Sequence, residues 1–169
     1  KGRFRSVDNS PVDNLACGRL SRMPLEPYDL RDPAALIEQL SDSVRWEDGR
    51  VYLVLIRDPS GDQRIVSVEK LRIRLRMRHW ARARQDLEKR SDAWHIPNAW
   101  PANHMALLIA ARSGRCVGGP REGDWLDALH FANLMGPVFK GGLIIVTEHG
   151  WMDWKTQWAG DTPRLKQAA

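Results

Sequence analysis

Cysteine is scarce in this sequence. Only Cys17 and Cys116 occur among 169 residues, and they lie far apart along the chain. Two distant thiols cannot build the disulfide framework of a small secreted domain, although a single bridge between them stays open. The cysteine content therefore predicts a reducing compartment, with a cytoplasmic location as the default.

Long hydrophobic runs are missing as well. The longest is MALLIAA at 105–111, and LIIV at 143–146 is another. A helix needs about 20 apolar residues to cross a bilayer, so neither run is long enough. We expect no membrane partner and interpret both runs as buried strands.

Local metal-binding and nucleotide-binding motifs are also absent. None of the five histidines belongs to an HxH, HExxH or Cys-His pair, which are spacings typical of metal sites. The glycine-rich segment RSGRCVGGP at 112–120 matches neither GxxxxGK[ST] nor GxGxxG. We therefore expect no cofactor and no bound metal.

The length and the order of elements predict one domain. We expect an extended N-terminal arm at 1–28, a single globular domain at 29–158 and a C-terminal tail at 159–169. Apolar periodicity, caps and turns predict helices at 33–43, 78–92 and 122–136, and strands at 49–58, 63–68, 105–111 and within 141–151. This alternation favours an α/β or α+β sandwich of two or three layers, with a small mixed sheet of three to five strands.

What the sequence does contain is a concentrated positive charge. The net charge is +5, and residues 69–90 hold nine lysines or arginines against three acids. This one segment accounts for the whole positive balance. A local field of this kind concentrates an anionic partner, whereas evenly spread charge mainly favours solubility.

Within that segment, LRIRLRMRHWARAR at 71–84 begins with strict alternation of apolar residues and arginine. In a strand the first four arginines point one way, roughly 6.5 Å apart; in a helix they scatter round the axis. We favour the strand, followed by a tryptophan on which a base can stack. The predicted nucleic-acid-binding residues are Arg72, Arg74, Arg76, Arg78, Trp80, Arg82 and Arg84. The alternative is a solvated face whose arginines pair with Glu38, Asp42 or Glu69.

The glycine-rich segment 112–120 lies between a predicted strand and a predicted helix, where phosphates are often held. Arg112, Ser113 and Arg115 are therefore candidates for an anion-binding loop, and a plain strand-to-helix connection is the alternative. Cys116 has no base at a fixed spacing that would make it a nucleophile. An enzyme site at the strand ends would also draw on Asp124, Glu148 and His149.

From residue 105 to 151, the order of features resembles the C-terminal part of RadC-type proteins of the JAB/JAMM fold. That family has a buried strand, a loop of the form HxHPSG…P(S/T)xxD, a helix and a second apolar strand that ends in a glycine turn. The matching features here are MALLIAA, Ser113-Gly114, Pro120, Asp124 and GGLIIVTEHGW.

The same resemblance places the family's two metal-binding histidines at Ile109 and Ala111, and its serine at Arg121. It therefore implies a copy without the metallopeptidase chemistry. In such a copy, Asp124 caps the following helix or pairs with Arg112 or Arg121.

The favoured function is a non-enzymatic domain that binds nucleic acid or another polyanion through an arginine-rich strand face. One alternative is a hydrolase-like enzyme, a degenerate JAB-type protein, with its site at the ends of strands 105–111 and 143–146. Another is a protein-interaction module whose tryptophan-rich C-terminal part, with Trp154 and Trp158, docks on a protein partner.

Overall fold

The structure is a computed structural model that describes residues 28–76, 80–98 and 101–165. Apart from Tyr28, the predicted N-terminal arm lies outside these residues. The elements in chain order are α1 Pro33–Ser43, β1 Arg50–Arg57, β2 Arg64–Lys70, α2 Trp80–Ser91, β3 His104–Ala111, α3 Pro120–Phe131, β4 Val138–Thr147, β5 Gly150–Asp153 and β6 Ala159–Gly160.

The strands form one mixed sheet in the order β2-β1-β3-β4-β5-β6. Neighbouring strands are antiparallel except β3 and β4, which are parallel and joined through α3. The prediction of a small mixed sheet is correct in kind, but the sheet has six strands instead of three to five. Two short strands, β5 and β6, make the difference.

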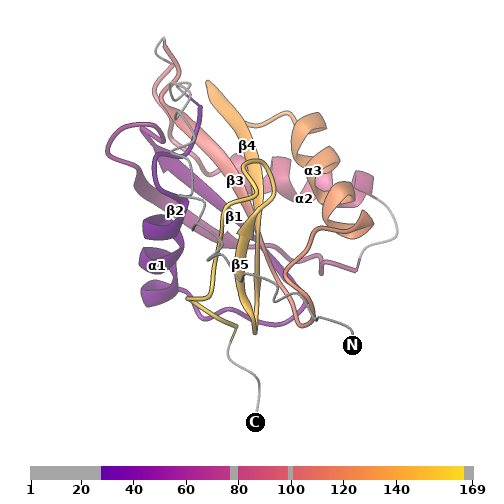
Figure 1. Ribbon diagram of the computed structural model, residues 1–169. Coiled ribbons are helices and arrows are strands. Elements are labelled where there is room, and N and C mark those ends of the chain that lie inside the picture. Colours follow the sequence, from indigo (N-terminus) through magenta and orange to yellow (C-terminus); the bar gives the residue numbers. More distant parts are fainter. Residues whose placement is uncertain (1–27, 77–79, 99–100, 166–169) are drawn as a thin grey trace, which may run out of the picture.

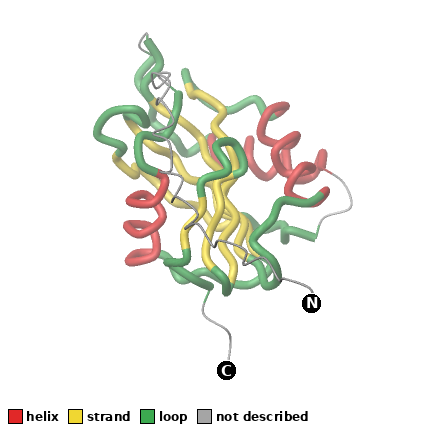
Figure 2. The backbone as a smooth tube through the Cα atoms, viewed as in Figure 1, coloured by secondary structure: helices red, strands yellow, loops and turns green. Residues whose placement is uncertain are grey.

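The sheet is the middle layer of a three-layer sandwich. Helix α1 covers one face, and α2 and α3 cover the other (Figures 1 and 2). Along β3, Ala106, Leu108 and Ala110 pack into the core under α2 and α3, whereas Leu107 and Ile109 pack into the core under α1. Because both faces of β3 are covered, its sequence after His104 is an unbroken apolar run.

The predicted helix at 33–43 is confirmed with its cap. Asp32 is the N-cap, and its carboxylate accepts a hydrogen bond from the Ala35 amide at 3.0 Å. Pro33 occupies the first helical position, where the missing N–H is no loss. The buried side of the helix consists of Leu36, Ile37 and Leu40, with Pro33.

The last predicted helix starts two residues earlier and ends five residues earlier than expected. Two side chains of α2 accept hydrogen bonds from the backbone that follows α3. Glu88 accepts from the Asn133 amide at 2.9 Å, and Ser91 Oγ accepts from the Met135 amide at 3.2 Å. These bonds replace the helical ones. Met135 is therefore exposed, although its spacing placed it on the buried face.

Residues 71–76 of the arginine-rich segment do not form a strand, and this corrects our interpretation. Strand β2 lies at the edge of the sheet and pairs only with β1, where Lys70 lies opposite Tyr52. Since β1 begins at Arg50, a continued β2 has almost no partner left. The described residues beyond it, 71–76, are irregular, and α2 begins only at Trp80.

Residues 159–165, which we assigned to a tail, belong to the fold. Ala159–Gly160 pairs with β5, and the Leu165 amide donates to Thr147 O at 2.9 Å. Leu165 itself is 5% exposed. Among the helices in the described parts of the chain, none is long and apolar enough to cross a membrane.

Candidate anion-binding pocket

A pocket of about 640 Å³ lies at the end of the sheet where β2 and β3 finish and β1 begins. We call this the pocket end and the opposite end, where residues 58–63 join β1 to β2, the hairpin end. The pocket is bounded by the turn before β1, the segment after β2, the loop after β3 and the first turn of α3. Its lining residues are Asp48, Gly49, Arg74, Leu75, Arg76, Arg112, Ser113, Gly119, Pro120, Arg121 and Glu122.

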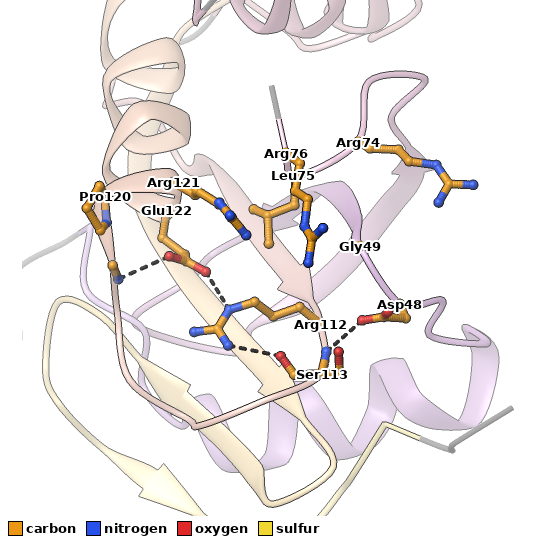
Figure 3. A pocket seen from close by; sticks show the side chains of 11 residues that line it. Asp48, Gly49, Arg74, Leu75, Arg76, Arg112, Ser113, Pro120, Arg121 and Glu122 are labelled. Atoms are coloured by element: carbon orange, nitrogen blue, oxygen red, sulfur yellow. Dashed lines mark hydrogen bonds and ion pairs between the residues drawn. The ribbon is translucent and has the colours of Figure 1, made fainter. Parts of the chain in front are cut away.

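Four arginines from three separate segments line this pocket. Figure 3 shows the guanidinium groups of Arg76 and Arg121 directed into the same space, while that of Arg112 turns toward Glu122 and Arg74 extends away at the rim. The structure therefore joins the two sites that the sequence suggested separately. The arginine-rich segment supplies Arg74 and Arg76, and the glycine-rich loop supplies Arg112 with Ser113.

The segment that carries Arg74 and Arg76 is fixed by its leucines. The Leu71 amide donates to Val51 O and the Leu75 amide to Gly49 O, both at 2.9 Å, and both side chains are buried under α2 and α3. Trp125 of α3 donates its indole N–H to Leu75 O at 3.3 Å. Buried and exposed side chains thus alternate along this segment although it is not a strand, because the leucines pack inward.

Asp86 of α2 holds the start of the same segment. Its carboxylate accepts the Arg72 amide at 2.8 Å and the Ile73 amide at 3.4 Å. The acid therefore orders the backbone, while the Arg72 side chain is left exposed.

Arg112 is held in place by a nearly buried carboxylate. Its Nε donates to Glu122 Oε1 at 2.5 Å, and its two terminal nitrogens donate to Ser113 O at 3.2 Å and Val117 O at 2.7 Å. The second oxygen of Glu122 accepts the Gly119 amide at 3.0 Å. Because the Glu122 side chain is only 4% exposed, this ion pair fixes both the loop and the start of α3.

The amides of the predicted anion-binding loop donate to carboxylate side chains of the protein itself. The Ser113 amide donates to Asp48 at 2.6 Å, and the Gly114 amide donates to both oxygens of Glu148 at 2.9 and 3.0 Å. Gly114 has φ +100, which favours glycine. Amide donation from Gly114 lowers the pKa of Glu148 below its usual value of 4.5, so this carboxylate is unsuited to the role of general acid.

The charges of the pocket are not balanced. Its two carboxylates are occupied, Asp48 by a backbone amide and Glu122 by Arg112 and Gly119. No ion pair or side-chain hydrogen bond joins another described residue to the guanidinium groups of Arg74, Arg76 or Arg121. The ion pairs that we considered for a solvated face are not formed, since Glu69 pairs with Arg90 and neither Glu38 nor Asp42 pairs with an arginine of this segment within the described chain.

The other predicted nucleic-acid-binding residues that the structure describes do not line the pocket. Arg78 falls outside the described residues. Arg82 is exposed on α2, while Arg84 lies over the Trp80 ring at 5.7 Å and pairs with Glu88 at 3.6 Å. Trp80 is 42% exposed and contacts Phe131 with ring centroids 5.7 Å apart.

Several residues of the enzyme hypothesis do not come together. Ile109 and Ala111, the positions of the two histidines in the RadC-type alignment, are fully buried in the core under α1. Asp124 is exposed on α3, on the opposite face of the sheet. It neither caps α3, whose N-cap is Gly119, nor pairs with an arginine among the described residues; Glu122 does both.

The remaining candidates are placed as follows. Arg115 is exposed and does not line the pocket, and burial raises the pKa of the Cys116 thiol, which opposes a nucleophilic role. His149 Nε2 is 3.8 Å from Glu148. Of the C-terminal tryptophans, Trp158 is 45% exposed, whereas Trp154 packs so closely on Gly118 that a β-carbon there would clash with its ring.

Sequence reasoning missed Arg121 and Asp48 as pocket residues. A signal for Arg121 was present, because Gly119-Pro120 marks a helix start and places an arginine in the first turn. A cation is unfavourable there, since the N-terminus of a helix is already positive. Asp48 carried no such signal; its place follows from the pairing of β1 with β3.

Comparisons of the chain with family models, with curated proteins and with solved structures found no match. The resemblance to RadC-type proteins therefore stays a prediction.

Proposed function

We propose that this domain binds nucleic acid, or a polyanion of similar charge spacing, at the pocket end of the sheet. One observation carries the proposal: Arg76 and Arg121 point into one pocket, with Arg74 at its rim, and none of the three has a carboxylate partner in the described chain. Gathering like charges costs free energy unless an anion is present. A polyanion supplies that missing charge.

Further exposed arginines lie outside the pocket. Arg72 precedes Arg74 on the same irregular segment, and Arg82 is exposed on α2. Guanidinium groups bind phosphate oxygens through paired donors. Their role here is to contact the backbone of the ligand, which gives affinity without sequence preference.

The test is binding of a fluorescently labelled single-stranded and a double-stranded oligonucleotide, measured by anisotropy over a salt series. Binding should weaken linearly on a log–log plot, since each neutralised phosphate contributes a slope of roughly −0.7 on single strands and −0.9 on duplex. The double variant Arg76→Gln/Arg121→Gln removes two unpaired charges and should flatten the slope by about one to two units.

The matched control is Arg57→Gln/Arg64→Gln, which removes the same charge at the hairpin end. It should leave the slope nearly unchanged. The proposal fails if the wild type shows no salt-dependent binding, or if both double variants weaken it equally. The second result would mean that net charge alone attracts the oligonucleotide.

A further inference from the structure

The pocket differs from the rest of the arginine surface in the kind of phosphate that it suits. Outside it, single exposed arginines match the single negative charge of a backbone phosphodiester. Inside it, four arginines meet the two carboxylates Asp48 and Glu122, which leaves a net charge of +2, and Arg76 and Arg121 have no ion-pair partner in the described chain. A net charge of +2 in one space corresponds to a dianion, and a phosphate monoester carries a charge of about −1.5 to −2 at pH 7.

The start of α3 adds donors to the same space. Its first turn carries Arg121, and the Arg121 and Glu122 amides have no acceptor within the described chain, because Gly119 is the N-cap and helical bonding begins with the Gly123 amide. These amides and the helix dipole favour an anion. The Ser113 hydroxyl, which lacks a described partner, lines the opposite wall.

Together, the donors approach from three directions. Arg76 comes from the segment after β2, Arg121 from α3 and Ser113 from the loop after β3 (Figure 3). A phosphomonoester has three terminal oxygens to satisfy, whereas a phosphodiester has two. The volume of about 640 Å³ exceeds that of a phosphate alone and lies in the range of sites for small organic ligands.

We propose that the pocket binds the terminal phosphomonoester of a nucleic-acid strand together with its terminal nucleotide. This inference rests on the proposed function, because the strand beyond the terminal nucleotide is held by the exposed arginines. Arg74, at the rim, marks where the strand leaves the pocket. The domain then recognises a phosphorylated end.

The experiment compares four single-stranded oligonucleotides of one sequence, each labelled internally: with a 5′-phosphate, with a 3′-phosphate, with neither, and with neither but two nucleotides longer. The longer strand adds two charges without a monoester. One of the two phosphorylated strands should bind about tenfold or more tightly than both unphosphorylated strands, as expected for several charge-assisted hydrogen bonds. The 5′ and 3′ arms identify which end is recognised.

In Arg76→Gln/Arg121→Gln that preference should disappear, while Arg57→Gln/Arg64→Gln should keep it. Ser113→Ala, which leaves all charges in place, should reduce it in part and guards against a folding defect in the double variant; circular dichroism verifies that all variants fold. Equal binding of all four strands by the wild type overturns this inference and leaves the proposed function standing.

If no strand binds but inorganic phosphate protects the wild type against heat, both proposals fail and the pocket serves a small phosphorylated molecule. If neither strands nor phosphate bind, the pocket is not an anion site at all.

Discussion

Arginines lie at both ends of the sheet, and the two ends differ in how their charge is balanced. At the hairpin end, Arg57 and Arg64 share a hollow of about 160 Å³ with Asp58 and Asp62, and Arg64 pairs with Asp62. At the pocket end, four arginines meet two carboxylates that are already occupied. Whether arginines at a site carry unpaired charge therefore depends less on their number than on whether the nearby carboxylates pair with them.

The acids of the pocket end are used to shape the backbone. Asp48, Glu148 and Asp86 each accept backbone amides and hold the segments from which the arginines project. At the hairpin end, Asp58 likewise accepts the Asp62 amide at 3.0 Å, but Asp62 is left to pair with Arg64. Because the acids at the pocket end hold the backbone, they leave the nearby arginines unpaired.

The largest expected effect comes from removing the anchor of the pocket arginines. Leu75→Ala should lower the free energy of unfolding by about 2–5 kcal/mol, because Leu75 is 2% exposed and its loss leaves a cavity. It should also weaken oligonucleotide binding, since Arg74 and Arg76 lose their support. Urea unfolding and anisotropy measure the two effects.

Leu36→Ala is the control for that experiment. Leu36 is fully buried under α1, so its loss should destabilise the protein by a similar amount. It should leave binding intact below the melting temperature. Equal loss of binding in both variants would show that binding reports general stability instead of the pocket.

A smaller effect, of opposite sign for stability and binding, is expected from Glu122→Gln. The change deprives Arg112 of its nearly buried carboxylate and should cost about 1–3 kcal/mol in chloride buffer. The same change frees the Arg112 charge for a ligand, so affinity for a phosphorylated oligonucleotide should rise. Comparing thermal unfolding in chloride and in phosphate checks this, because phosphate should reduce the loss of stability. An equal loss in both buffers would contradict the prediction.

Stability should also depend on pH through Glu148, by an amount smaller than the preceding effects. Hydrogen bonding to the Gly114 amide lowers the pKa of Glu148 from 4.5 in the folded state. A lowered pKa means that the stabilisation is complete above the unfolded value and is lost as the pH falls through the folded value. Glu148→Gln should therefore differ from the wild type in urea unfolding at pH 6, and the difference should shrink near pH 3. A difference that stays constant over this pH range would show that the ionised Glu148 carboxylate does not stabilise the fold.

The smallest effect is expected from Arg76→Gln/Arg121→Gln in the absence of any anion. Both side chains are exposed, and surface changes usually alter stability by about 0.5 kcal/mol or less. Relief of repulsion should make the sign favourable at low salt, which thermal unfolding measures. A clear destabilisation would indicate that these arginines have structural partners.

The arginine segment shows what its sequence could and could not reveal. Alternation indicated that Leu71 and Leu75 are buried and that Arg72, Arg74 and Arg76 are exposed, and the structure agrees. It could not reveal that the strand ends at Lys70. The end of β2 depends on where its partner strand begins, and β1 begins at Arg50, only two residues before Tyr52, which lies opposite Lys70.

Convergence of the two candidate sites was equally hidden. Residues 74–76 and 112–113 meet because β1 lies between β2 and β3 in the sheet, a long-range pairing without a local signature. The same holds for the capture of the loop amides by Asp48 and Glu148, which are distant in sequence. Periodicity, caps and charge counts depend on residues that are close in sequence. They therefore indicated the separate segments of the site, but not that these segments lie together.

The most direct test of the unbalanced pocket end is an NMR titration that follows the arginine Nε–H signals as a 5′- or 3′-phosphorylated oligonucleotide is added. Signals of Arg76, Arg112 and Arg121 should shift together with one binding constant, while those of Arg57 and Arg64 stay in place. Equal shifts at both ends, or shifts at neither, would contradict the account.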